Sequence, residues 1–97
     1  MYAGIRQVKA KPGVADMLAR RIKEGVIARI SSVPGFRAYY VVYAADDTVT
    51  AVSIFDNAAS AEESNRRAMA WIEKELAAML AGPATAMAGP VIVHVSE

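Results

Sequence analysis

Two segments of the chain carry apolar residues at three- and four-residue steps, and β-rich runs flank each segment. The first extends from Val14 to Val33, and charged residues fill the positions between its apolar ones. The second follows Ser60, which forms a capping-box pattern with Glu63, and stops before Gly82 and Pro83. Apolar residues at this spacing predict two amphipathic helices, each packing one side against a sheet.

Four β-rich runs surround these helices, at Tyr2–Lys9, Phe36–Tyr43, Val49–Phe55 and Val91–Val95. The order β-α-β-β-α-β predicts a single ferredoxin-like α+β domain over residues 1–97, with a four-stranded antiparallel sheet. Right-handed crossovers place both helices on one face of that sheet. Gly25 lies within the apolar side of the first helix, where we expect it to permit close approach to the sheet.

The other face of the sheet then has no helix to cover it. We expect it to carry Val8, Ala51, Phe55 and several of the four tyrosines, which is too apolar a surface to leave in water. The chain is 55% hydrophobic, and 97 residues have limited interior volume. The sequence therefore predicts a homodimer in which two sheets pack face to face as a dimeric α+β barrel.

Composition argues against several classes of protein. The net charge is +1 and no basic face is evident, which is atypical of nucleic-acid binders. The absence of Cys excludes disulfides and thiolate metal sites, and one His is too few for a usual metal centre. Dinucleotide and P-loop motifs are absent, so no cofactor is expected. Without a leader-like N-terminus or an uninterrupted apolar span, the expected location is cytoplasmic, with no membrane segment.

Two residues are candidates for acid–base catalysis. His94, the only histidine, lies in the last predicted strand, where it is either a general base lining a cavity or a strand-end side chain that is hydrogen-bonded or exposed. Glu75 falls within the apolar arc of the second helix. A carboxylate there either takes part in proton transfer or forms a structural ion pair.

Three further residues are candidates for ligand binding. Arg6 shares its strand face with apolar neighbours, so it is expected to be a half-buried cation that needs an anionic partner. That partner is either a carboxylate or phenolate ligand, or an acidic side chain across the dimer interface. Asn65 and Trp71 lie on or beside the apolar side of the second helix, where they either contact a ligand or pack in the core or interface.

Together with the order of elements, two short motifs carry a family resemblance: Val33-Pro34-Gly35-Phe36 at a turn and Val52-Ser53-Ile54-Phe55-Asp56 at a strand end. With them the chain resembles the antibiotic biosynthesis monooxygenase-like family. The resemblance implies a dimeric α+β barrel built from two ferredoxin-like subunits. Members with known activity include cofactor-free oxygenases of polyphenolic substrates and haem-degrading enzymes.

The resemblance also directs attention to particular positions. The oxygenases look to have an Asn and a Trp on the third strand, where this chain has Ala51 and Phe55. The haem-degrading group looks to have an Asn on the first strand and a Trp at the end of the third, which match Arg6 and Phe55, and a His on the second helix, which has none here. Phe55 is therefore also a candidate ligand-binding residue.

Two functions follow as hypotheses. The first is a cofactor-independent monooxygenase-type enzyme acting on a small aromatic or polyphenolic molecule. The alternative is a non-catalytic module on the same barrel that binds a small apolar or aromatic ligand or serves dimerisation.

Overall fold

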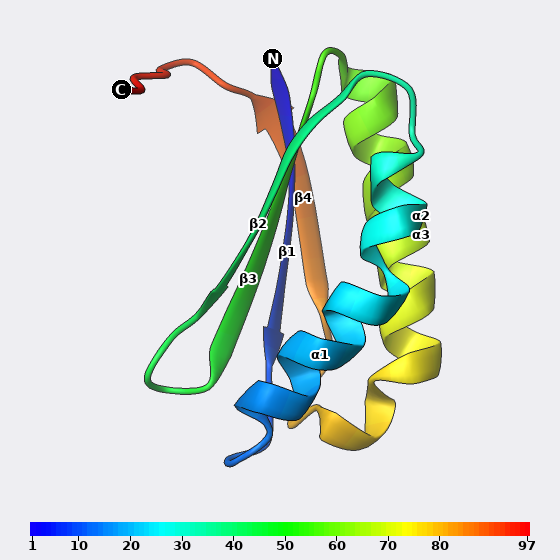
Figure 1. Ribbon diagram of the computed structural model, residues 1–97, viewed down its shortest axis with the longest axis vertical. Helices are drawn as coiled ribbons and strands as arrows, with labels where there is room; N and C mark the ends of the chain where they lie inside the picture. Colours follow the sequence, from blue (N-terminus) through cyan, green and yellow to red (C-terminus); the bar gives the residue numbers. More distant parts are fainter.

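A computed structural model describes residues 1–97 and has one antiparallel sheet with its helices on a single side (Figure 1). In chain order the elements are β1 (Tyr2–Lys9), α1 (Ala15–Gly25), α2 (Ile27–Ser31), β2 (Phe36–Tyr43), β3 (Thr48–Phe55), α3 (Ala58–Glu75), the 3-10 helix η1 (Ala77–Met79) and β4 (Thr85–Pro90). The strand order is β2-β3-β1-β4, with β1 paired to both β3 and β4. This confirms the predicted ferredoxin-like fold.

The first predicted helix is divided into α1 and α2, with Val26 between them. Gly25 ends α1 beneath the indole of α3, and a Cβ there would lie 2.4 Å from Cζ2 of Trp71. The prediction that Gly25 lets the helix approach the sheet was therefore wrong. Its missing side chain makes room for Trp71 instead.

The second predicted helix begins earlier than the capping-box pattern indicated. Asn57, in extended conformation, is the N-cap residue of α3, and its Oδ1 accepts a 2.9 Å hydrogen bond from the Ser60 amide. Glu63 does not complete a capping box, because its carboxylate binds Arg66 and Arg67. Ser60 therefore lies within the first turn of the helix.

The faces of the sheet are the reverse of the prediction for Val8, Ala51 and Phe55, and three of the four tyrosines also pack on the helix side, namely Tyr2, Tyr39 and Tyr43. Val8 and Phe55 are buried in the core beneath the helices, and Ala51 faces the same side. The open face instead carries one cross-strand row formed by Tyr40, Val52, Ile5 and Met87. Both faces are apolar, so alternation along each strand could not identify the covered one. The open face nevertheless remains apolar, as the dimer prediction requires.

The last strand is also displaced from its predicted position. β4 ends at Pro90, which is in register with Tyr2, and the Val91 amide then donates a 3.0 Å hydrogen bond to the Met1 carbonyl. Residues 92–95 make no backbone hydrogen bond to a neighbouring strand. The predicted strand Val91–Val95 is therefore an exposed segment outside the sheet.

No helix is long and apolar enough to cross a lipid bilayer.

Candidate functional site

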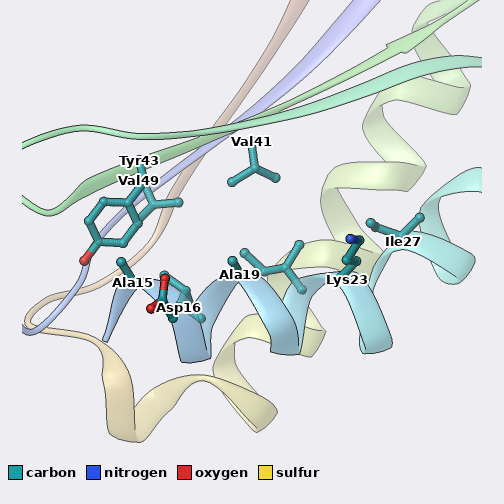
Figure 2. A pocket seen from close by; sticks show the side chains of 10 residues that line it. Ala15, Asp16, Ala19, Lys23, Ile27, Val41, Tyr43 and Val49 are labelled. Atoms are coloured by element: carbon teal, nitrogen blue, oxygen red, sulfur yellow. The ribbon is translucent and has the colours of Figure 1, made fainter. Parts of the chain in front are cut away.

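An open cleft lies between the first helix and the β2–β3 hairpin. Figure 2 shows Ala15 and Ala19 of α1 on one wall, and Val41, Tyr43 and Val49 of the hairpin opposite them. The cleft has a volume of about 380 Å³, and eight of its ten lining residues are hydrophobic. This size and lining are typical of a pocket for a small apolar molecule.

Few polar groups line this cleft. Asp16 and Lys23 of α1 are its charged residues. The Tyr43 hydroxyl donates a 2.8 Å hydrogen bond to Oδ1 of Asp47, and this bond raises the pKa of Tyr43 above its usual value. Tyr43 is therefore held in place as a neutral wall of the cleft.

Behind the cleft lies a smaller and more enclosed cavity of about 30 Å³. Leu18, Ile22 and Val49 line both spaces, so these side chains form the boundary between them. Eleven of the twelve residues around the inner cavity are hydrophobic, and the remaining one is Arg6. A space of this size holds a water molecule or a single small polar group.

Arg6 is buried to 1% exposure on the helix-facing side of β1. Its Nη1 donates to the Gly4 carbonyl at 3.3 Å and to Oδ1 of Asn65 at 3.1 Å, while Nε and Nη2 have no partner within the protein. The guanidinium carbon lies 5.5 Å from the centre of the Tyr39 ring. No carboxylate pairs with this cation, since none of the ion pairs in the structure includes it.

The contacts of Arg6 offset only part of the free-energy cost of burying its charge. Burying an ion costs several kcal/mol, whereas a desolvated cation–π contact returns about 2 kcal/mol. Burial accordingly lowers the pKa of Arg6 from its ordinary value, and the adjacent Tyr39 side chain opposes that shift. The inner cavity therefore contains a cation with two free donors, which is the chemistry that recognises an oxyanion.

Asn65 holds the guanidinium in this orientation. Its Nδ2 donates a 2.9 Å hydrogen bond to the Met87 carbonyl of β4, so the opposite end of the amide, Oδ1, faces Arg6. The site also requires a glycine in β1, because a Cβ on Gly4 would lie 2.8 Å from Oδ1 of Asn65. Asn65 was predicted to bind a ligand, and its observed contacts are with Arg6 and β4.

The other two predicted ligand-binding residues differ in position. Trp71 lines the inner cavity, packed over Gly25. Phe55 is fully buried and meets Phe36 edge-on, with ring centroids 5.8 Å apart, and it lines neither space. A ligand role for either residue stays a prediction.

The two predicted acid–base residues lie outside both spaces. Glu75 is exposed, and its Oε2 lies 3.8 Å from Nη1 of Arg21. This contact is the structural ion pair expected from the sequence as the alternative to proton transfer. His94 is exposed in the C-terminal segment beyond β4. Neither residue lines the cleft or the inner cavity, and their catalytic roles stay predictions.

Sequence reasoning missed Ser53, whose buried Oγ has no partner within the protein, and the cleft residues Asp16 and Val41. The only sequence signal for Ser53 was a polar side chain alternating with Ala51 and Phe55 on one strand face. The cleft residues gave no signal, because they meet only when α1 and the hairpin come together.

Solved structures with the same fold include two whose ligands are known. A monooxygenase from the gene ActVA-Orf6 of Streptomyces coelicolor, in complex with Nanaomycin D, is 17% identical with a TM-score of 0.75, covering 99% of this chain and 91% of that one. The haem-degrader MhuD of Mycobacterium tuberculosis, with two haems bound, is 17% identical with a TM-score of 0.74, covering 99% and 100%. At this identity, the likeness concerns the fold.

A putative antibiotic biosynthesis monooxygenase from Nitrosomonas europaea is 13% identical with a TM-score of 0.73, covering 96% of this chain and all of that one. No curated protein sequence matches the chain. The family model described as antibiotic biosynthesis monooxygenase matches residues 1–70, which is most of the sequence. The protein therefore belongs to the antibiotic biosynthesis monooxygenase family.

Proposed function

We propose that this protein is a cofactor-independent monooxygenase-type enzyme that oxidises a small aromatic molecule bearing an acidic hydroxyl group. The observation that carries the proposal is Arg6, a buried cation whose Nε and Nη2 lack partners beside an apolar cavity. In this proposal the aromatic rings occupy the cleft between α1 and the hairpin, and the ionised oxygen reaches Arg6 when Leu18 and Ile22, which separate the two spaces, move aside.

Ionisation of the substrate is the step that Arg6 promotes. A nearby cation in a poorly solvated site lowers the pKa of a phenol, because it stabilises the phenolate. The proton leaves to solvent through the open cleft. An electron-rich phenolate can transfer an electron to O₂ without help from a protein-bound group, and the cleft then holds the two radicals together.

The chemistry balances without a cofactor. A ring carbon that carries hydrogen combines with O₂ to give a hydroperoxide, and loss of water then breaks the C–H and O–O bonds and leaves a carbonyl. A phenol and O₂ give a quinone and H₂O, so the substrate supplies all four electrons. The negative charge on the peroxide oxygen is a second group that Arg6 would stabilise.

Haem fits the site poorly. Haem iron is commonly held by a His ligand, and the single histidine, His94, is exposed and lines neither space. Groups of three or more His, Cys, Asp or Glu side chains able to hold a metal are also absent. No step of the proposed reaction therefore passes through haem.

The test uses dihydroxynaphthalene, whose oxidation to a hydroxynaphthoquinone consumes one O₂ and releases one H₂O. We expect O₂ uptake and quinone formation at a one-to-one ratio. The variant Arg6→Met should lower kcat/KM about ten- to hundredfold, the loss typical of a charge-assisted hydrogen bond. Equal kcat/KM for wild type and Arg6→Met would count against the proposed enzyme. So would a wild-type rate no higher than the uncatalysed rate with every hydroxylated naphthalene and anthracene tried.

The alternative is a module that binds a small aromatic anion without changing it. It is favoured by the inner cavity, whose lining contains no carboxylate or imidazole next to Arg6. Native mass spectrometry of the purified protein separates the two: a retained, unmodified phenol supports the module, and an oxidised product supports the enzyme.

We also propose that two copies pack through the open face of the sheet. Its exposed side chains include Tyr40, Val42 and Met87, and alternation adds Ile5 and Val52 between them. A surface of this kind marks an interaction site. Analytical ultracentrifugation at micromolar concentration should give the mass of a dimer, and the variant Val42→Lys should shift the protein towards the monomer.

A further inference from the structure

The two free donors of Arg6 lie on the same edge of its guanidinium group. Nε and Nη2 have no partner within the protein, whereas Nη1 donates to the Gly4 carbonyl and to Oδ1 of Asn65. In a planar guanidinium the N–H bonds of Nε and Nη2 are nearly parallel, and together they bind one anion through two hydrogen bonds. This Nε–Nη2 edge is therefore free, and the contacts of Nη1 hold it in a fixed orientation.

The inner cavity, which Arg6 lines, has room for a single small ion. Its volume is about 30 Å³, which accommodates about one water-sized particle. A chloride ion is only slightly larger than a water molecule, whereas sulfate and phosphate ions are much larger. Arg6 is the only charged residue among those that line this cavity. The space therefore suits a monatomic anion.

Charge favours an anion over a neutral water molecule at this edge. Arg6 is 1% exposed, and no ion pair of the structure includes it. Opposite charges attract far more strongly in a poorly solvated site than in water, so an anion compensates the buried cation better than a water molecule does. The apolar lining disfavours fluoride, because a strongly hydrated ion loses more on leaving water. Chloride and bromide match both the size and the charge of the site.

We propose that the inner cavity is a halide site, in which one chloride ion accepts hydrogen bonds from Nε and Nη2 of Arg6. The site itself rests on Arg6 and its cavity. One consequence rests on the proposed function: the ionised oxygen of the substrate needs the same two donors, so chloride and substrate compete. Chloride then holds the cation in place until substrate enters, and its concentration regulates the reaction.

Diffraction at the bromine absorption edge tests the halide site in the wild-type protein. Crystals soaked in sodium bromide should show an anomalous peak within hydrogen-bonding distance of Nε and Nη2 of Arg6. In solution, sodium chloride should raise the thermal midpoint above that in sodium gluconate of equal ionic strength, because a ligand that binds the folded state stabilises it. Arg6→Met should abolish this difference. Arg66→Met, which removes an exposed cation instead, is the matched control and should keep it.

Enzyme kinetics test the competition. At constant ionic strength, chloride at about ten times its dissociation constant should raise the KM for dihydroxynaphthalene about tenfold and leave kcat unchanged. Gluconate, which is too large for the inner cavity, should have no effect on either constant. A KM that chloride does not change, with bromide bound at Arg6, would show that the substrate does not use these donors and would overturn the competition.

The outcomes separate the halide site from the proposed function. A water molecule without anomalous signal beside Arg6, together with equal midpoints in the two salts, overturns the halide site. If that protein still oxidises dihydroxynaphthalene, the proposed function stands without it. Bromide bound at Arg6 in a protein without turnover supports the halide site and contradicts the enzyme.

Discussion

Arg6 and Asn65, 59 residues apart in the chain, are joined by a 3.1 Å hydrogen bond between Nη1 and Oδ1. The bond connects β1 to α3, and Asn65 continues it to the β4 backbone through Met87. It satisfies one nitrogen of the guanidinium and leaves the other two free. Asn65 thus supports the cation without neutralising it.

Replacing Asn65 by Asp should keep the Arg6 guanidinium in place while neutralising its charge. The carboxylate would pair with the guanidinium about 3 Å away but could no longer donate to the Met87 carbonyl. Because these two effects oppose each other, we expect the free energy of unfolding to stay within about 1 kcal/mol of wild type. Affinity for a phenolate should fall at least tenfold, since the cation is already neutralised. Arg66→Ala, which removes an exposed pair with Glu63, is the control. Unchanged affinity in Asn65→Asp would mean that the ligand does not depend on the charge of Arg6.

Arg6→Met should leave stability unchanged or raise the free energy of unfolding by up to about 2 kcal/mol. Removing a buried charge without an acidic partner relieves its desolvation cost, and Met fills a similar volume. Urea denaturation measures the difference. A loss of more than about 2 kcal/mol would show instead that the protein already compensates the cation fully.

Gly25→Ala should destabilise the fold although Ala favours helices. The new Cβ would lie 2.4 Å from Trp71 Cζ2, so the indole or α1 must move. Overpacking of this kind costs about 1–3 kcal/mol, against a gain of about 1 kcal/mol from helix propensity. Gly82→Ala, where a Cβ meets nothing within 4 Å, is the matched control and should change stability by less than about 0.5 kcal/mol. Equal thermal midpoints for the two variants would refute the packing argument.

The Glu63 carboxyl should titrate below its usual range. Hydrogen bonds from Arg66 and Arg67 favour its ionised form and lower its pKa. A lowered pKa in the folded state means that this contribution to stability is present above the unfolded pKa of about 4.3 and is lost as pH falls through the folded value. Carbon-detected NMR titration measures the pKa directly, and Arg66→Ala with Arg67→Ala should return it towards the ordinary value. If Glu63 has the same pKa in the double variant as in wild type, Arg66 and Arg67 are not the cause of the lowered value.

The order of elements was predictable because each half of the chain changes periodicity clearly, from strand to helix and back. The covered face was not, since Ile5 and Val52 make one side of the sheet as apolar as Val8 and Phe55 make the other. The final strand was misplaced because strand propensity cannot reveal that β1 begins at Tyr2 and leaves Ile92 onward unpaired.

The candidate site was predictable only in part. Arg6 stood out as a cation among apolar residues, and Asn65 as an amide on an apolar helix side. Their contact depends on β1 and α3 crossing at Gly4, which no spacing in the sequence reveals. His94 and Glu75 were chosen as the available bases, and the fold puts both outside the cavities.

Arg6 is the proposed anchor for an ionised oxygen. Trp71, the only tryptophan, lines the same cavity, so its fluorescence should change when a ligand binds there. The decisive measurement is the quenching of Trp71 fluorescence by dihydroxynaphthalene as a function of pH, in wild type and in Arg6→Met. We predict that wild-type affinity rises as the phenol ionises, whereas Arg6→Met binds weakly at every pH. Identical pH profiles for the two proteins would contradict the central claim.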